Sequence, residues 1–60
     1  MSVDYFVKQQ VLEAIRHGSS DKTDIAKATG LPSDLVDDAL WELTREKKVR
    51  QDNEQLFLED

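Results

Sequence analysis

The 60-residue sequence predicts a small α+β domain in which three helices precede a C-terminal two-stranded β-hairpin. Apolar residues recur at helical spacing in three segments, which are separated by a glycine at position 18 and by a Gly-Leu-Pro turn at positions 30–32. Two short apolar segments on either side of a polar turn then end the chain, as in a hairpin. The composition, 38% hydrophobic and 35% charged, is typical of a globular chain rather than a disordered one. We therefore expect a single domain over residues 1–60.

The first helix is expected over residues 4–17, where Val11 and Ile15 belong to a stripe of apolar residues at helical spacing. Gly18 follows as the residue that can adopt the left-handed conformation with which many helices end. Phe6 falls on the outer face of this helix, away from the stripe. An N-terminus that folds back over the core would explain Phe6, and so would a contact between two copies of the chain. We favour a homodimer contact through Phe6, because a small core gains most from a second subunit.

The second helix is expected over residues 22–29, with a small apolar face, and Gly30 ends it. The third helix is expected over residues 33–47. Pro32 tolerates the start of a helix and Ser33 can cap one, so together they mark its beginning. The apolar residues of this helix form one stripe, and the basic residues near its C-terminus suit the helix dipole.

The hairpin is expected over residues 49–58. Its turn is expected at residues 52–54, where an asparagine tolerates a positive φ. Because side chains alternate along a strand, Val49, Leu56 and Leu58 should face the core and Phe57 the opposite side.

Trp41 lies on the far side of the third helix from its apolar stripe, since successive residues are about 100° apart around a helix. Asp34, Asp38 and Arg45 share this face. An exposed tryptophan would anchor a protein partner here, because tryptophan is enriched among interface hot spots. Alternatively, Trp41 packs inside the domain under the hairpin, or the Arg45 side chain covers it in a cation–π contact. The sequence leaves these alternatives open.

Several function classes are not expected. No apolar run exceeds three residues, and the first residues lack the basic and apolar regions of a signal peptide, so we expect a soluble, cytoplasmic chain without a membrane span. The absence of cysteine leaves no disulfide and no thiolate metal site. The two glycines do not make a phosphate-binding loop, and His17 is a lone histidine without a catalytic companion. We therefore expect neither an enzyme nor a bound cofactor or metal.

A group of small and apolar positions has the spacing of a helix, a turn, a helix and a strand: Ile25-Ala26, Gly30-Leu31, Val36, Ala39-Leu40, Leu43 and Val49. This pattern resembles the winged-helix superfamily, in particular the bacterial and archaeal transcription-regulator domains whose wing directly follows the recognition helix. The resemblance covers nearly the whole chain once the first helix and the hairpin are included. It implies a winged helix-turn-helix in which the third helix enters the major groove of DNA and the hairpin contacts the phosphate backbone.

Charge is distributed unevenly along the chain. Residues 1–30 carry four basic and four acidic side chains, whereas residues 31–60 carry four basic and nine acidic ones and so hold the entire net charge of −5. Where DNA readers of this type offer polar or basic groups to the bases, the third helix carries Asp34, Asp37 and Asp38. We expect these carboxylates to form a solvated face rather than a metal site. The basic residues of this half gather where the third helix meets the hairpin: Arg45, Lys47, Lys48 and Arg50.

Two functions therefore remain open. The resemblance places first a DNA-binding transcription regulator, which would contact phosphates through Ser33 and the four basic residues at the junction. The alternative role of those basic residues is to compensate the helix dipole and to pair with Glu42 and Glu46. The charge distribution instead favours a protein-interaction module, in which four residues of the third helix face a protein partner: Asp34, Asp37, Asp38 and Trp41.

Overall fold

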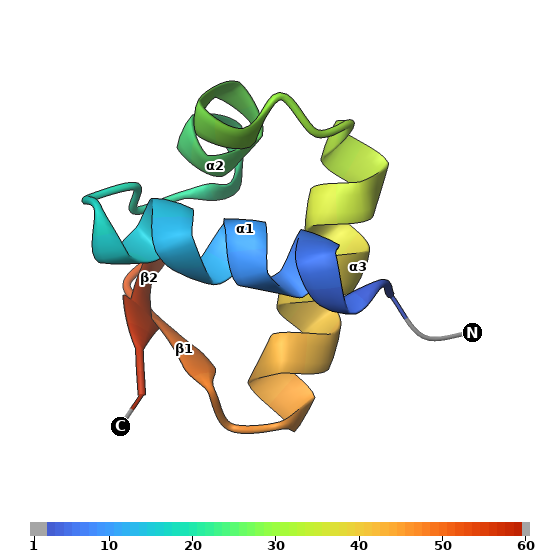
Figure 1. The fold of residues 1–60 in the computed structure, drawn as a ribbon. Helices are drawn as coiled ribbons and strands as arrows, with labels where there is room; N and C mark the ends of the chain where they lie inside the picture. The colour runs from blue at the N-terminus through green and yellow to red at the C-terminus, as the bar shows by residue number, and fades with distance from the viewer. Residues whose placement is uncertain (1–2, 60) are drawn as a thin grey trace.

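The computed structural model describes residues 3–59 and has three helices followed by a two-stranded antiparallel sheet, which confirms the predicted fold class (Figure 1). The helices are α1 (Tyr5–Arg16), α2 (Lys22–Thr29) and α3 (Ser33–Arg45), and the strands are β1 (Val49–Asp52) and β2 (Gln55–Leu58). In Figure 1, α1 crosses α3 and lies between α2 and the hairpin. None of the described helices is both long and apolar enough to cross a membrane.

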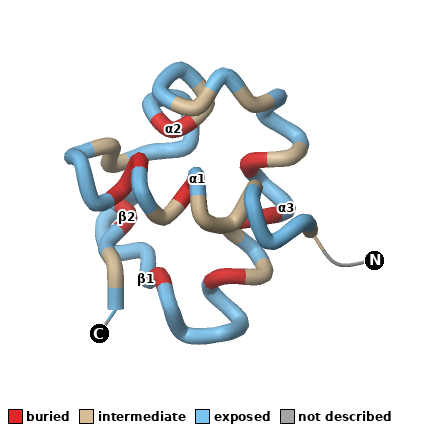
Figure 2. The backbone as a smooth tube through the Cα atoms, in the orientation of Figure 1, coloured by how far each residue is buried: buried red, intermediate tan, exposed pale blue. Residues whose placement is uncertain are grey.

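The core consists of aliphatic side chains from every helix and both strands. Figure 2 shows the buried positions on the inward sides of the elements. None of the four aromatic side chains, all of which lie within residues 3–59, belongs to this core. Nine hydrophobic residues are buried among the described ones: Val11, Ala14, Ile15, Ile25, Val36, Ala39, Leu43, Val49 and Leu56.

The predicted first helix, residues 4–17, is one residue too long at each end. Asp4 and His17 are the residues that cap α1 and do not belong to the helix itself. The Asp4 carboxylate accepts the backbone N–H of Phe6 at 2.8 Å and thereby caps the helix from outside. At the other end Gly18 has a φ of 112°. The N–H of Ser19 then reaches back to the carbonyl of Ala14 at 2.9 Å, as in a Schellman closure. Gly18 ends the helix as predicted.

α3 begins at Ser33, as predicted, but the residue at its N-cap differs from the expected one. Pro32 occupies the N-cap position with an extended backbone, and no side chain caps the helix there. Ser33 is the first helical residue rather than a cap. Gly30, with a φ of 74°, ends α2 as predicted, and the hydroxyl of Thr29 accepts the N–H of Leu31 at 3.2 Å within the turn. This hydrogen bond helps to fix the turn before α3.

The end of α3 also differs, since the helix stops at Arg45 and not at residue 47. Lys47 has a φ of 62°, the left-handed conformation that glycine usually supplies. The N–H groups of Lys47 and Lys48 reach back to the carbonyls of Thr44 and Leu43 at 3.1 and 2.9 Å. These two bonds close α3 as a Schellman motif, although no glycine marks it in the sequence.

The hairpin has a two-residue turn, formed by Asn53 and Glu54 with φ values of 51° and 66°. Two positive φ angles define a type I′ turn. Asp52 pairs with Gln55 and therefore belongs to β1 rather than to the turn, where it was predicted. Val49 and Leu56 are buried and Phe57 is exposed, as the alternation predicted. The N–H of Leu56 donates to the carbonyl of Ser20 at 2.8 Å and ties the hairpin to the loop between α1 and α2.

A three-residue ion cluster joins α1 to α3. The Lys8 ammonium lies 3.0 Å from the Glu42 carboxylate and 2.7 Å from that of Glu46. Glu42 also accepts the backbone N–H of Val3 at 2.7 Å. The hydrogen bonds to Glu46 and then Glu42 raise the pKa of Lys8, and the hydrogen bond from Lys8 lowers the pKa of each carboxyl. Lys8 is thus the closest cation to both glutamates that were predicted to pair with the basic junction, although Lys48 of the junction also lies 3.6 Å from Glu46.

Replacing the left-handed lysine at the end of α3 should stabilise the fold. Lys47→Gly is expected to raise the free energy of unfolding by roughly 0.5–1 kcal/mol, because glycine adopts a positive φ without a Cβ clash, offset in part by backbone entropy. Lys27→Gly removes the same kind of side chain from within α2 and should instead lower the free energy of unfolding by about 1 kcal/mol, because glycine is unfavourable inside a helix. Urea unfolding of both variants measures the difference. Equal destabilisation would show that the conformation of Lys47 carries no strain.

The ion cluster should make stability depend on pH in a defined direction. The pKa values of Glu42 and Glu46 lie below their ordinary value of 4.5 in the folded state, so their contribution is complete above pH 4.5 and is lost as the pH falls through the lowered values. The pKa of Lys8 lies above 10.5, so its contribution is lost only as the pH rises through that raised value. Lys8→Met should therefore lower the urea midpoint at neutral pH and have a smaller effect well below pH 4.5.

Lys27→Met is the matched control, since none of the ion pairs between described residues involves Lys27. Its effect on the urea midpoint should be similar at both pH values. If Lys8→Met lowered the urea midpoint equally in acid and at neutral pH, the ion cluster would not be the source of the pH dependence of stability.

Candidate functional site

The four aromatic side chains all lie at the surface. Tyr5 and Phe6 on α1 are 69% and 75% exposed, Trp41 on α3 is 61% exposed, and Phe57 on β2 is 39% exposed. An aromatic side chain can bury roughly 150–250 Å² of surface, so these are the largest apolar groups that the core could have used. A chain with such a small core leaves all of them outside, which marks their surfaces as candidate interfaces.

The outer surface of α3 carries the first of these surfaces, which we call the α3 face: Asp34, Asp38, Trp41 and Arg45. All four side chains are exposed. The Arg45 guanidinium lies 4.9 Å from the centre of the Trp41 ring, so the predicted cation–π contact is present. Trp41 does not pack under the hairpin. It remains accessible beside Arg45.

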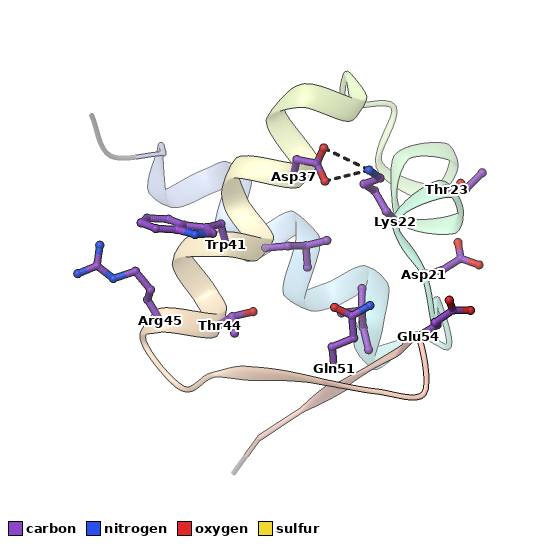
Figure 3. A pocket seen from close by; sticks show the side chains of 11 residues that line it. Asp21, Lys22, Thr23, Asp37, Trp41, Thr44, Arg45, Gln51 and Glu54 are labelled. Carbon is purple, nitrogen blue, oxygen red and sulfur yellow. Dashed lines mark hydrogen bonds and ion pairs between the residues drawn. The ribbon is translucent and has the colours of Figure 1, made fainter.

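Asp37 points to α2 instead of sharing the α3 face. Figure 3 shows its carboxylate beside the Lys22 ammonium, with its two oxygens at 3.1 and 3.2 Å. Lys22 is the first residue of α2, so this pair bridges the two helices on either side of the turn. No ion pair between described residues engages Asp34 or Asp38. Within residues 3–59, no group of three acidic or histidine side chains is placed to hold a metal ion.

An open groove of about 940 Å³ lies between the start of α2, the side of α3 and the hairpin (Figure 3). Trp41 and Arg45 lie on its α3 side, and Gln51 and Glu54 on its hairpin side. We call it the α3 groove. Its apolar lining is Leu40, Trp41 and Leu56, and its charged lining is Asp21, Lys22, Asp37, Arg45 and Glu54.

Two of the four basic residues at the junction lie beside carboxylates. Arg50 lies 3.8 Å from Asp52 and 5.2 Å from the centre of the Phe57 ring, while Lys48 lies 3.6 Å from Glu46. Of the predicted pairs with Glu42 and Glu46, the structure therefore has only this Lys48 contact. Lys47 is exposed at the end of α3.

Ser33 is not near the basic junction. It is exposed at the first position of α3, whereas Arg45 is at the last. By the helical rise of 1.5 Å per residue, the two lie about 18 Å apart along the axis. The predicted phosphate-contacting set is thus split between the two ends of α3.

Two residues of these surfaces, Lys22 and Tyr5, were not singled out from the sequence, and Glu54 was assigned only to the hairpin turn. Lys22 and Glu54 line the α3 groove, and Tyr5 lies edge-on to Phe6 with ring centres 6.2 Å apart. The pairing of Lys22 with Asp37 spans 15 positions and has no local signal in the sequence. Tyr5 lies next to Phe6 in the sequence, and its position at the start of the first helix could have indicated its exposure.

Comparisons with protein-family models, with curated proteins and with solved structures find no match to this chain. The resemblance to winged-helix proteins therefore stays a prediction from the spacing of its residues.

Proposed function

We propose that this chain is a protein-interaction domain, which binds a positively charged segment of a partner protein through the α3 face and the α3 groove. The observation that carries the proposal is the exposed Trp41, which belongs to both surfaces. Tryptophan contributes strongly to interfaces when a partner covers it, and little to a fold that leaves it in water. The proposal assigns no catalytic activity to the chain.

The charge around Trp41 supports a cationic partner. Asp34 and Asp38 flank it on the α3 face, and Asp21, Asp37 and Glu54 lie along the groove. Lysine or arginine side chains of a partner would meet carboxylates there, while its apolar groups would contact the Leu40 and Leu56 lining. Such complementarity speeds association and selects between partners.

The second candidate is DNA binding, in the manner implied by the winged-helix resemblance. One observation favours it: α3 and the hairpin line the same groove, as a recognition helix and a wing would. However, the carboxylates of that surface would repel phosphates. Lys22, the cation at the start of α2, is already paired with Asp37. We therefore place DNA binding second.

We also propose a cytoplasmic location. Small domains that work in oxidising compartments are usually held together by disulfides, and this chain contains no cysteine. A reducing compartment suits such a fold.

A titration can separate the two candidates, because Trp41 is the only tryptophan and its emission reports on the α3 face. At low salt, a lysine-rich amphipathic peptide should shift and quench this emission, and its affinity should fall as salt is added. Duplex DNA of mixed sequence should leave the emission unchanged. Asp38→Lys should weaken peptide binding by about two- to fivefold, the effect expected for the loss of one exposed ion pair.

Glu59→Lys is the control, since it makes the same charge change outside both the α3 face and the α3 groove, and it should bind the peptide nearly as the wild type does. Equal weakening by both variants would mean that net charge, rather than the α3 face, attracts the peptide. Salt-dependent binding to the duplex that Arg45→Ala weakens, without peptide binding, would reject the proposal in favour of DNA binding.

A further inference from the structure

We propose that a second copy of this chain binds across the groove between α1 and α2, with Phe6 as the reciprocal contact. This open groove of about 560 Å³ shares no lining residue with the α3 groove. We call it the α1–α2 groove. Its lining includes Phe6, Gln10, Glu13, Ala14, His17 and Ala28.

Among the described residues, Phe6 is the most exposed of the large hydrophobic side chains, at 75%. The described residues before α1 do not fold back over it, because the N–H of Val3 bonds to Glu42 on α3. Ala14 and Ala28 are small and leave the groove open beside the ring. Phe6 of one copy can therefore insert into the α1–α2 groove of a second copy. Phe6 of the second copy can insert into the groove of the first, so the contact is reciprocal.

The charge of this surface indicates that the occupant is a second copy. Residues 1–30, which include α1 and α2, have no net charge, whereas the chain as a whole carries −5. The ionisable side chains lining the α1–α2 groove are one acid, Glu13, and one histidine, His17. Two copies meeting through their α3 faces would bring Asp34 and Asp38 against the same carboxylates. Of the two grooves, the α1–α2 groove brings fewer carboxylates together when two copies meet, so two acidic chains repel each other less there.

The positions along α1 are self-complementary in an antiparallel pair. Phe6, Gln10, Glu13 and His17 follow one another at four-, three- and four-residue steps, which places them on one side of the helix. A two-fold axis between Gln10 and Glu13 sets Phe6 against the partner's His17, and Gln10 against the partner's Glu13. The first contact stacks a ring on an imidazole, and the second joins an amide to a carboxylate. Each contact occurs twice, as an isologous interface requires.

The same geometry limits the strength of the dimer. A 12-residue helix is about 18 Å long, so the buried area falls toward the lower end of specific interfaces. The dimer is therefore weak and depends on concentration. Because the two grooves share no residue, it leaves both copies of the α3 face accessible, which would give the dimer two binding surfaces.

Sedimentation equilibrium of the full chain, from micromolar to millimolar concentration, tests the proposal. The average mass should rise toward that of a dimer, and Phe6→Ser should weaken the dimer at least about tenfold. Trp41→Ser is the control, since it removes another exposed ring and should leave the dissociation constant unchanged. Gln10→Lys, which sets an ammonium against the partner's Glu13, should tighten the dimer about two- to fivefold.

A chain that stays monomeric throughout this range overturns the proposal. So does a dimer that Phe6→Ser leaves intact. An unchanged dissociation constant for Gln10→Lys overturns the antiparallel arrangement. These outcomes do not depend on whether the α3 face binds a cationic partner, because Phe6 and Gln10 lie outside the α3 groove and the measurement contains no peptide.

Discussion

Burial of a few aliphatic side chains is the constraint on which this structure depends. Val11 of α1, Ile25 of α2, Leu43 of α3 and Val49 of β1 are almost fully buried, so every helix and the hairpin contribute to one core. A chain of this length buries only about 60% of its unfolded surface, which leaves no second core to compensate for a missing element. Valine, isoleucine, leucine and alanine fill the available space, and the aromatic rings stay outside. Their exposure is the physical origin of both proposed surfaces.

The ion cluster of Lys8 with Glu42 and Glu46 influences which acidic side chains remain on the outer surface of α3. It directs Glu42 of α3 and Glu46, the residue that caps its C-terminus, toward α1, where Glu42 also accepts the N–H of Val3. Lys22 draws Asp37 toward α2 in the same way. The charges that stay outward on α3 are those around Trp41, while the surface of α1 and α2 is nearly neutral. The two surfaces proposed as interfaces therefore differ in charge: the one on α3 is acidic and the one on α1 and α2 has little net charge.

Local patterns predicted most of the fold, because they arise from neighbouring residues. Helical spacing located all three helices, and glycine ended α1 and α2 where it was expected. The end of α3 was predicted two residues late, because Lys47 adopts the conformation that a glycine would have signalled. The side of Trp41 followed from its helical position, but its contact with Arg45 could not be distinguished from packing under the hairpin. The environment of Trp41 depends on where the hairpin lies. The ion-pair partners of Lys8 depend on how α1 crosses α3. Neither is determined by neighbouring residues in the sequence, so neither could be predicted from local patterns.

Solvent accessibility of individual rings and methyl groups, measured by NMR with a soluble paramagnetic probe, tests most directly whether the aromatic side chains form two separate surfaces. At low concentration the probe should broaden the ring signals of Phe6 and Trp41 while sparing the methyl signals of Ile25 and Leu43. Raising the protein concentration should protect Phe6 but not Trp41, and adding a cationic peptide to dilute protein should protect Trp41 but not Phe6. Rings that are as protected as the core methyl groups in dilute solution, or that become protected together, would contradict this account.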